Sequence, residues 1–284
     1  MTTIVPNDQW LVMRTSVKET GDRFAELVAR ASDPRAKATP HWTVVDTAAH
    51  VATVAALHNS CLPGGSLSLD GPDLAYRVQM TTVDTVSALN DYAMGHFTER
   101  DRHVLVDRLR SEVGRLLELS DGVDPDSAVP WLGESRVPVA GILAHILNEL
   151  SIHGHDIARA TRSPWTIPPQ DAATFLEYFL VGVIRHGYGR LLDRDEPPRP
   201  GRIAVRFQSR YTTPVTLALT DGIVSLAAEA DPFDVRVTFD PTVLNLMMFG
   251  RVSKARAVLA GKVVVTGRRP WRLPAFLQTL RMPS

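Results

Sequence analysis

The stretch His145-Ile-Leu-Asn-Glu149-Leu-Ser-Ile-His153-Gly-His155-Asp156 predicts a long helix with both core residues and candidate metal ligands. Glu149 and His153 are four residues apart, just over one helical turn, so their side chains project from the same face. A carboxylate beside an imidazole supplies two of the three ligands of a His/His/Glu metal site. The same spacing is also common in surface pairs worth a few tenths of a kcal/mol, so a third ligand is needed.

His50 is the first candidate for this third ligand. It lies in a second helical run that is rich in Ala and Val, and helices of a bundle build metal sites from facing side chains. His145 is the alternative, because it precedes Glu149 by four residues and shares its face. His155 is rotated by roughly 200° from His153 on the helix and is expected to point elsewhere.

Apolar residues recur at helical spacing through the first two thirds of the chain. This pattern predicts helices over residues 7–31, 43–60, 83–119, 139–161 and 170–190. Thr43 and Asp46 form a capping-box pattern, with Asp in place of Glu, at the start of the second helix. Gly95 is a candidate break or kink in the long third run. Long helices with short connections predict a four-helix bundle.

The composition changes after residue 192. Residues 193–201 are charged and rich in proline, as is typical of an exposed linker. Short β-like runs follow over residues 203–207, 215–219, 224–228 and 235–239, with Asp221-Gly222 as a hairpin signal. Helices are expected over residues 241–249, 253–259 and 271–282, and a buried strand over 261–267. The sequence therefore predicts a helical domain at residues 1–192, a linker at 193–201 and an α+β domain at 202–284.

The composition argues against several classes of protein. The chain of 284 residues is 44% apolar, which is ample for a core, and its 31 basic residues balance 31 acidic ones. A zero net charge gives no electrostatic reason to expect nucleic-acid binding. The sequence contains no run of roughly 18 apolar residues that could span a membrane. Its first residues do not resemble a signal peptide. We therefore expect a cytoplasmic protein.

Cys61 is the only cysteine, which excludes internal disulfides and a cysteine-rich zinc site. It ends an apolar helical run, and no evident base lies beside it in the sequence. We therefore expect a small, half-buried residue at a helix end rather than a reactive thiol.

Two segments together carry a family resemblance. They are Trp42-Thr-Val-Val-Asp46-Thr-Ala-Ala-His50 and Asn148-Glu149-Leu-Ser-Ile-His153-Gly-His-Asp156. They resemble the two motifs of the mycothiol-dependent maleylpyruvate isomerase family, whose members contain a DinB-like, metal-binding helical bundle. The resemblance implies that His50, Glu149 and His153 bind a divalent metal, with zinc expected. Asp156 would orient His153 through its free ring nitrogen, or else be a solvated or capping carboxylate.

The second part of the chain is similar to another known fold. Residues 220–222, 239–242 and 261–267 resemble the sterol-carrier-protein fold, which many members of this family carry after the bundle. The family resemblance implies mycothiol as a cosubstrate and a small electrophile as the substrate, with isomerisation or S-transfer as the reaction. It also implies a substrate-binding arginine in this part. The candidates are Arg251, Arg256, Arg268, Arg269 and Arg272.

Two other functions stay open on the sequence alone. One is a metal-dependent hydrolase that uses metal-bound water. The other is a protein that binds an apolar ligand or lipid in its second domain. A cavity for such a ligand would be lined by apolar residues that are also typical of an ordinary core, namely Val235, Val237, Leu244, Leu246, Met247, Met248 and Phe249.

Overall fold

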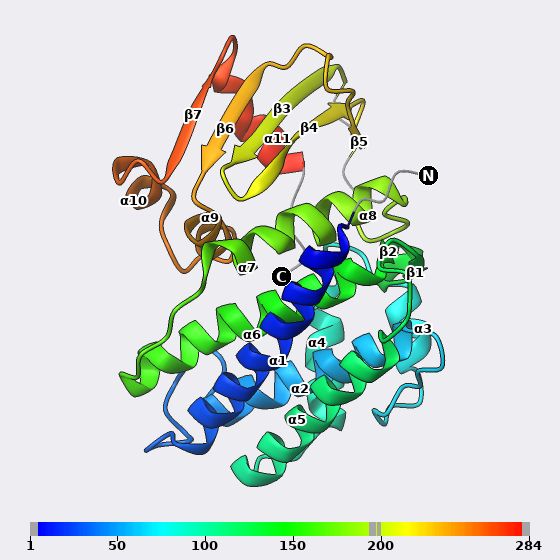
Figure 1. Cartoon of the computed structure of the whole chain (residues 1–284), viewed down its shortest axis with the longest axis vertical. Helices are drawn as coiled ribbons and strands as arrows, with labels where there is room; N and C mark the ends of the chain where they lie inside the picture. The colour runs from blue at the N-terminus through cyan, green and yellow to red at the C-terminus, as the bar shows by residue number, and fades with distance from the viewer. Residues whose placement is uncertain (1–4, 193–196, 198–199, 280–284) are drawn as a thin grey trace.

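The computed structural model describes residues 5–192, 197 and 200–279. A bundle of long helices forms one part of the molecule, and a twisted sheet with its own helices forms the other (Figure 1). Four helices build the bundle, α1 (Asn7–Ala29), α2 (Val44–Cys61), α5 (Arg102–Leu119) and α6 (Val139–Thr161). Helices α1 and α2 each pack against both α5 and α6. The expected fold class, a helical bundle followed by an α+β part, is confirmed.

Helix α2 begins with the capping box that the sequence predicts. The Thr43 hydroxyl accepts a hydrogen bond from the Asp46 amide at 3.2 Å, and Asp46 Oδ2 accepts one from the Thr43 amide at 3.0 Å. Arg100 also donates to Asp46 Oδ1 at 2.8 Å, which ties the cap to a neighbouring loop. Almost every residue of the helix is buried, because its many alanines let neighbouring helices approach closely. His50 is therefore placed inside the bundle.

Helix α6 is buried along most of its length and is held from the C-terminal side by Trp165. The indole nitrogen of Trp165 donates to the carbonyl of Ser151 at 3.0 Å. Its ring lies directly against Gly154, where an added Cβ would come within 2.1 Å of a ring carbon. Glycine at this position therefore allows the tryptophan to support the turn of helix that carries His153.

The prediction of a single helix over residues 83–119 is wrong. The structure divides it into α4 (Val86–His96) and α5, and Gly95 lies inside α4 rather than at the break. The break lies at residues 97–101, where Asp101 caps α5 by accepting hydrogen bonds from the amides of His103 and Val104. The sequence also did not indicate the short helix α3 (Leu74–Gln79) that precedes them.

The helix expected over residues 170–190 ends early and is irregular. It consists of α7 (Pro169–Thr174), a π-helical turn η2 (Phe175–Leu180) and α8 (Val181–Arg185). Before it in the chain, a small hairpin of β1 (Ala128–Pro130) and β2 (Arg136–Pro138) encloses the 3₁₀ turn η1 (Leu132–Glu134). The sequence did not indicate this hairpin, which places Trp131 in the core of the bundle.

The sheet has the strand order β5-β4-β3-β6-β7. Its strands are β3 (Arg202–Ser209), β4 (Thr212–Thr220), β5 (Ile223–Leu226), β6 (Val235–Phe239) and β7 (Val263–Gly267). Neighbouring strands are antiparallel except for β3 and β6, which are parallel. The predicted turn at Asp221-Gly222 joins β4 to β5. The prediction of a buried strand over 261–267 is wrong in one respect, because β7 lies at the sheet edge and only Val263 of it is buried.

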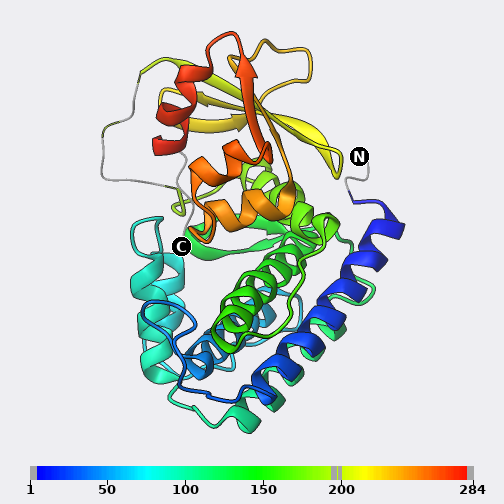
Figure 2. The same cartoon turned by 90° about the vertical axis from the view of Figure 1, so that its left-hand side faces the viewer.

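Helices α9 (Pro241–Met248), α10 (Lys254–Leu259) and α11 (Leu273–Thr279), with the 3₁₀ turn η3 (Pro270–Arg272), complete the second part. Figure 2 shows this part lying over one end of the bundle. The two hydrophobic cores meet there, because Leu176 of η2 belongs to the core of the sheet and Phe249 packs on the core of the bundle. Among the described residues, no helix is both long and apolar enough to cross a membrane.

The predicted domain boundaries, at residues 1–192 and 202–284, stay predictions. Residues 193–196 and 198–199 of the expected linker lie outside the described residues, as do the last residues, 280–284, of the expected final helix.

The contact between Gly154 and Trp165 gives a test of how α6 is held. Gly154→Ala forces a Cβ into the indole ring, and overpacking of this kind costs about 1–3 kcal/mol of unfolding free energy. Gly114→Ala in α5 is the matched control. Its Cβ would meet no atom within 4 Å, so the change should stabilise the protein by about 0.5–1 kcal/mol through helix propensity. Urea denaturation of both variants measures the difference, and equal stabilisation would show that Trp165 does not confine α6.

Candidate metal centre

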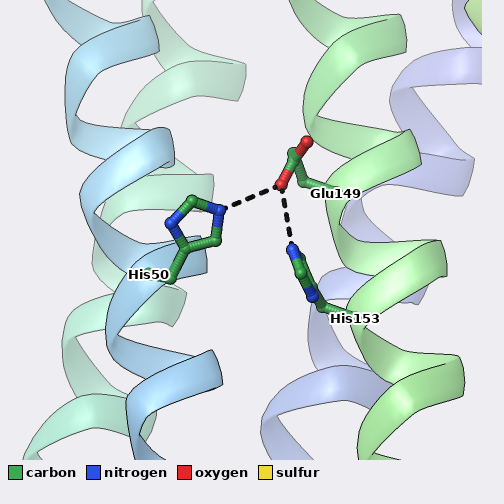
Figure 3. Close-up of side chains that lie close together, drawn as sticks. All are labelled: His50, Glu149 and His153. Atoms are coloured by element: carbon green, nitrogen blue, oxygen red, sulfur yellow. Dashed lines mark ion pairs between the residues drawn. The ribbon is translucent and has the colours of Figure 1, made fainter. Parts of the chain in front are cut away.

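Three side chains from two helices converge inside the bundle. Figure 3 shows Glu149 and His153 on α6 with His50 of α2 facing them, and the Glu149 carboxylate lying between the two imidazoles. Each residue offers one ligand atom within 4.8 Å of the other two. The structure thus brings together the three residues that the sequence singled out. Their role as metal ligands stays a prediction at this point.

The spacing of the donor atoms fits a small tetrahedral ion. Nε2 of His50 and Nε2 of His153 each lie 3.4 Å from Oε2 of Glu149. Metal–ligand distances of ~2.0–2.1 Å at tetrahedral angles place neighbouring ligand atoms about 3.3 Å apart. Two imidazoles and one carboxylate are also a ligand set found in catalytic zinc sites.

Burial and hydrogen bonding together set the charge of this cluster. The side chains of His50, Glu149 and His153 are only 6%, 13% and 11% exposed. Burial alone would raise the pKa of Glu149, but hydrogen bonds from His153 and His50 outweigh it and hold the pKa well below its usual value. Burial lowers the pKa of His50. At neutral pH the site therefore contains an ionised carboxylate and a neutral His50, the forms that bind a cation.

His153 is held by a chain of contacts that crosses from the bundle to the α+β part. Its Nδ1 lies 3.2 Å from Oδ2 of Asp156, and because a carboxylate only accepts, Nδ1 is the donor. Arg251, which follows α9, donates to both oxygens of Asp156, at 3.0 Å from Nε and 2.5 Å from Nη2. Asp156 is 1% exposed. It is therefore a buried carboxylate in contact with the ring of His153 rather than a solvated one, and its role in orienting a metal ligand stays a prediction.

The pKa of His153 is shifted in the opposite direction to that of His50. Burial alone would lower its pKa, but the hydrogen bonds to Asp156 and Glu149 outweigh burial and raise the pKa to about 9. A cation that takes Nε2 of His153 must therefore displace a proton at neutral pH.

His145 is less well placed than His50 to be the third ligand. Its Nε2 lies 3.9 Å from Oε1 of Glu149, whereas His50 and His153 approach Oε2 at 3.4 Å, and it is not part of the convergent group. The His145 ring packs instead against His58, Trp131 and Phe179, with centroid distances of 5.0, 5.2 and 4.5 Å. His155 does not line the cavity beside the cluster, as the helix geometry predicts.

A cavity of about 850 Å³ opens beside the three donors. Its lining comes from α2, α4, α6, η2 and the segment that follows α9, so it lies where the bundle meets the α+β part. Trp42 lines it and packs on His50 at a centroid distance of 4.5 Å. Of the five candidate arginines, only Arg251 lines this cavity. Its pairing with Asp156 was not predictable from the sequence, because 95 residues separate the two.

A known family matches the part of the chain that contains these residues. Residues 15–158, just over half of the 284, match the family model described as the mycothiol maleylpyruvate isomerase N-terminal domain. The chain belongs to this family. The match contains all three convergent residues and Asp156, and it confirms the family that the two motifs predict.

Two solved structures share the fold of the whole chain. A mycothiol-dependent maleylpyruvate isomerase is 17% identical with a TM-score of 0.50, and a mutant of that enzyme with one histidine replaced by alanine is 18% identical with a TM-score of 0.51. Both alignments cover 94% of this chain and 96% of the other. At such identities they show the common fold alone. A search of curated proteins gave no match.

A third structure tests the likeness of the second part. The sterol carrier protein 2 of Yarrowia lipolytica aligns with 32% of this chain and 85% of its own, at 18% identity and a TM-score of 0.23. That score is too low to carry an argument, so the sterol-carrier likeness of residues 202–284 stays a prediction.

The raised pKa of His153 predicts that the free energy of unfolding of this protein, without metal, depends on pH. The folded protein holds this proton up to about pH 9, whereas the unfolded chain releases it near 6.5. The stabilisation is therefore complete below pH 6.5 and is lost as the pH rises towards 9. His153→Gln should flatten this fall in the free energy of unfolding.

His155→Gln is the matched control, because the pKa of His155 is lowered, chiefly by burial, so this residue cannot cause a loss of stability as the pH rises. Denaturant titrations in chelator, between pH 6 and 9.5, measure the slopes. A His153→Gln slope equal to that of the unchanged protein contradicts the assigned pKa.

Proposed function

We propose that this protein is a divalent-metal-dependent enzyme that activates a low-molecular-weight thiol, mycothiol, for isomerisation of a small electrophile or for S-transfer to it. The observation that carries the proposal is the convergence of His50, Glu149 and His153 on one point beside a cavity. Membership of a family named for a mycothiol-dependent isomerase supports the choice of thiol. The two solved structures with the same fold are also described as mycothiol-dependent maleylpyruvate isomerases.

The three donors would hold the metal, with Zn²⁺ as the proposed ion. A divalent ion held by three protein ligands keeps a free position, and it lowers the pKa of a thiol that binds there, so that a nucleophile is available near neutral pH. Glu149 contributes a negative charge that is already present at neutral pH, because its pKa is lowered. His50 contributes a neutral imidazole.

The neighbouring residues orient the donors and shield them from water. Asp156 accepts from Nδ1 of His153 and so presents Nε2 to the cluster, a second contact that is typical of histidines in metal sites. Arg251 fixes Asp156 through two hydrogen bonds. Trp42 packs on His50 and lies 6.1 Å from the His153 ring, which reduces the access of water to the two imidazoles.

The one cysteine of the chain is poorly suited to act as the thiol nucleophile in this chemistry. This residue is Cys61, and burial raises the pKa of its thiol to about 12. Cys61 is the last residue of α2, and its thiol donates to the Leu57 carbonyl. The residue does not line the cavity. This agrees with the expectation of an unreactive residue and supports a borrowed thiol.

The proposed reaction needs no oxidant or reductant. The thiolate sulfur forms a bond to one carbon of a double bond conjugated to a carbonyl, and the π-electron pair moves to the carbonyl oxygen as an enolate. Rotation about the resulting single bond and expulsion of the thiolate give the other geometric isomer. Protonation of the enolate carbon instead gives a thioether. The first outcome is isomerisation and the second is S-transfer.

Elemental analysis tests the metal ligands directly. The purified protein should contain one divalent ion per chain, and His50→Ala should lose at least 90% of it, because two remaining ligands hold such ions weakly. His145→Ala is the matched control and should keep the ion. Full occupancy in His50→Ala with loss in His145→Ala would show that His145 is the third ligand.

Thiol dependence tests the chemistry. The metal-loaded protein should consume an α,β-unsaturated carbonyl compound only when mycothiol is added. Hydrolysis of a model ester or amide at the same metal site without thiol would replace this proposal with that of a metal-dependent hydrolase. Co-purified lipid, without thiol-dependent turnover, would replace it with that of an apolar-ligand-binding protein.

The contact between Arg251 and Asp156 predicts that the α+β part strengthens metal binding. Arg251→Leu should lower the affinity for Zn²⁺ about 10- to 100-fold, as is typical when a residue that orients a ligand is lost. Arg256→Leu, an exposed arginine outside the cavity, should leave the affinity unchanged. Competition with a zinc-binding dye measures both. Equal affinities would show that His153 is positioned without Arg251.

A further inference from the structure

Aromatic rings enclose one side of the cavity. Trp131, Phe175, Phe179 and Phe249 line it and are here called the aromatic wall. Phe175 and Phe179 are stacked, with centroids 5.2 Å apart, and Trp131 meets Phe179 edge-on at 5.8 Å. Phe249, from the α+β part, lies 5.6 Å from Phe175. The wall is therefore a continuous surface built from three separate segments of the chain.

The aromatic wall begins next to the proposed metal ligands. The His145 ring lies between them, with its Nε2 3.9 Å from Glu149 and its centroid 4.5 Å from that of Phe179. A substrate that reacts beside Glu149 would therefore extend along the wall. Aliphatic side chains add to this apolar lining. They include Val54, Leu57, Val86, Leu89, Leu132 and Ile152.

Few charged side chains of the cavity are free to pair with a substrate carboxylate. Among the described residues that line it, only Arg159 and Arg251 carry a fixed positive charge, against the carboxylates of Asp91, Glu149 and Asp156. Arg251 is already engaged, with two hydrogen bonds to Asp156 and one from Nη1 to the Phe249 carbonyl. Arg159 is exposed, and one of its nitrogens lies 3.4 Å from the Ala38 carbonyl. One guanidinium is thus available for a substrate carboxylate, with bidentate geometry.

We infer that the substrate is an electrophile with an apolar, preferably aromatic, body and no more than one carboxylate, rather than a small dicarboxylate. The reaction rests on the function proposed above, whereas the binding preference rests on the aromatic wall and on the single available arginine. An apolar body gains stability by leaving water for the aromatic wall, where ring edges and faces offer favourable contacts. A second carboxylate would lose its hydration against the aromatic wall, whose rings carry no compensating charge.

Binding of unreactive probes tests the preference without any chemistry. Calorimetry on the zinc-loaded protein, without thiol, should give an affinity for 4-phenylbutanoate at least tenfold higher than for succinate. Phe249→Ala should weaken 4-phenylbutanoate about tenfold or more, a typical effect of removing apolar contact from a pocket, and should leave succinate unchanged. Phe233→Ala, a partly buried phenylalanine of the same part that does not line the cavity, should change neither.

Three results would overturn the inference. They are equal or tighter binding of succinate, no binding of 4-phenylbutanoate at millimolar concentration, and an unchanged affinity in a folded Phe249→Ala protein. Circular dichroism establishes folding, and Phe249→Leu, with an expected smaller loss, provides a second variant that preserves packing.

Turnover separates this inference from the proposed function. With mycothiol, 4-phenylbut-3-en-2-one should be consumed with a kcat/KM at least tenfold above that of maleate. Thiol-dependent turnover that favours maleate would overturn the substrate class and leave the proposed function intact. Preference for 4-phenylbutanoate in a protein that binds no metal and shows no thiol-dependent turnover would support the apolar site and overturn the proposed function.

Discussion

The negative charge of Glu149 is the constraint on which this structure depends. A carboxylate that is 13% exposed is stable inside a helical bundle only if cationic or hydrogen-bonding groups surround it. Nε2 of His50 and of His153 lie at equal distances from one of its oxygens, and they come from helices that are separate in sequence. The packing of α2 against α6 therefore determines whether the Glu149 carboxylate has both imidazoles as hydrogen-bond partners. Removal of His50 or His153 leaves a buried charge without one of its two nearest partners.

The second part of the chain takes part in the same arrangement. Arg251 crosses from the segment after α9 to Asp156, and Asp156 fixes the ring of His153. Phe249, two residues earlier, contributes to the aromatic wall of the cavity. One short segment therefore orients a proposed ligand and also shapes the proposed substrate site. The apolar residues Leu244 and Val237, in contrast, belong to the core of the sheet, which agrees with the simpler interpretation of that stretch.

The local features of the site were predictable from the sequence, and the distant ones were not. The spacing of Glu149 and His153 determines that they share a face, and the capping box at Thr43 fixes where α2 begins. The apolar run around His50 indicates that it is buried. The end of α4 was missed because residues 97–101 contain no proline or glycine to mark a break, and Arg100 and Asp101 instead satisfy the backbone groups there. The aromatic wall and the Arg251–Asp156 pair depend on tertiary packing, which cannot be predicted from the periodicity of apolar residues in the sequence.

Cobalt substitution tests the central claim most directly, because Co²⁺ reports its own coordination. The Co²⁺-loaded protein should show the intense visible absorption of a four- or five-coordinate site, and mycothiol should add a sulfur-to-cobalt charge-transfer band in the near ultraviolet. Both signals should be absent from Glu149→Gln. A weak, six-coordinate spectrum that does not change with thiol, or equal spectra in the unchanged protein and Glu149→Gln, would contradict a thiol-activating metal centre built on His50, Glu149 and His153.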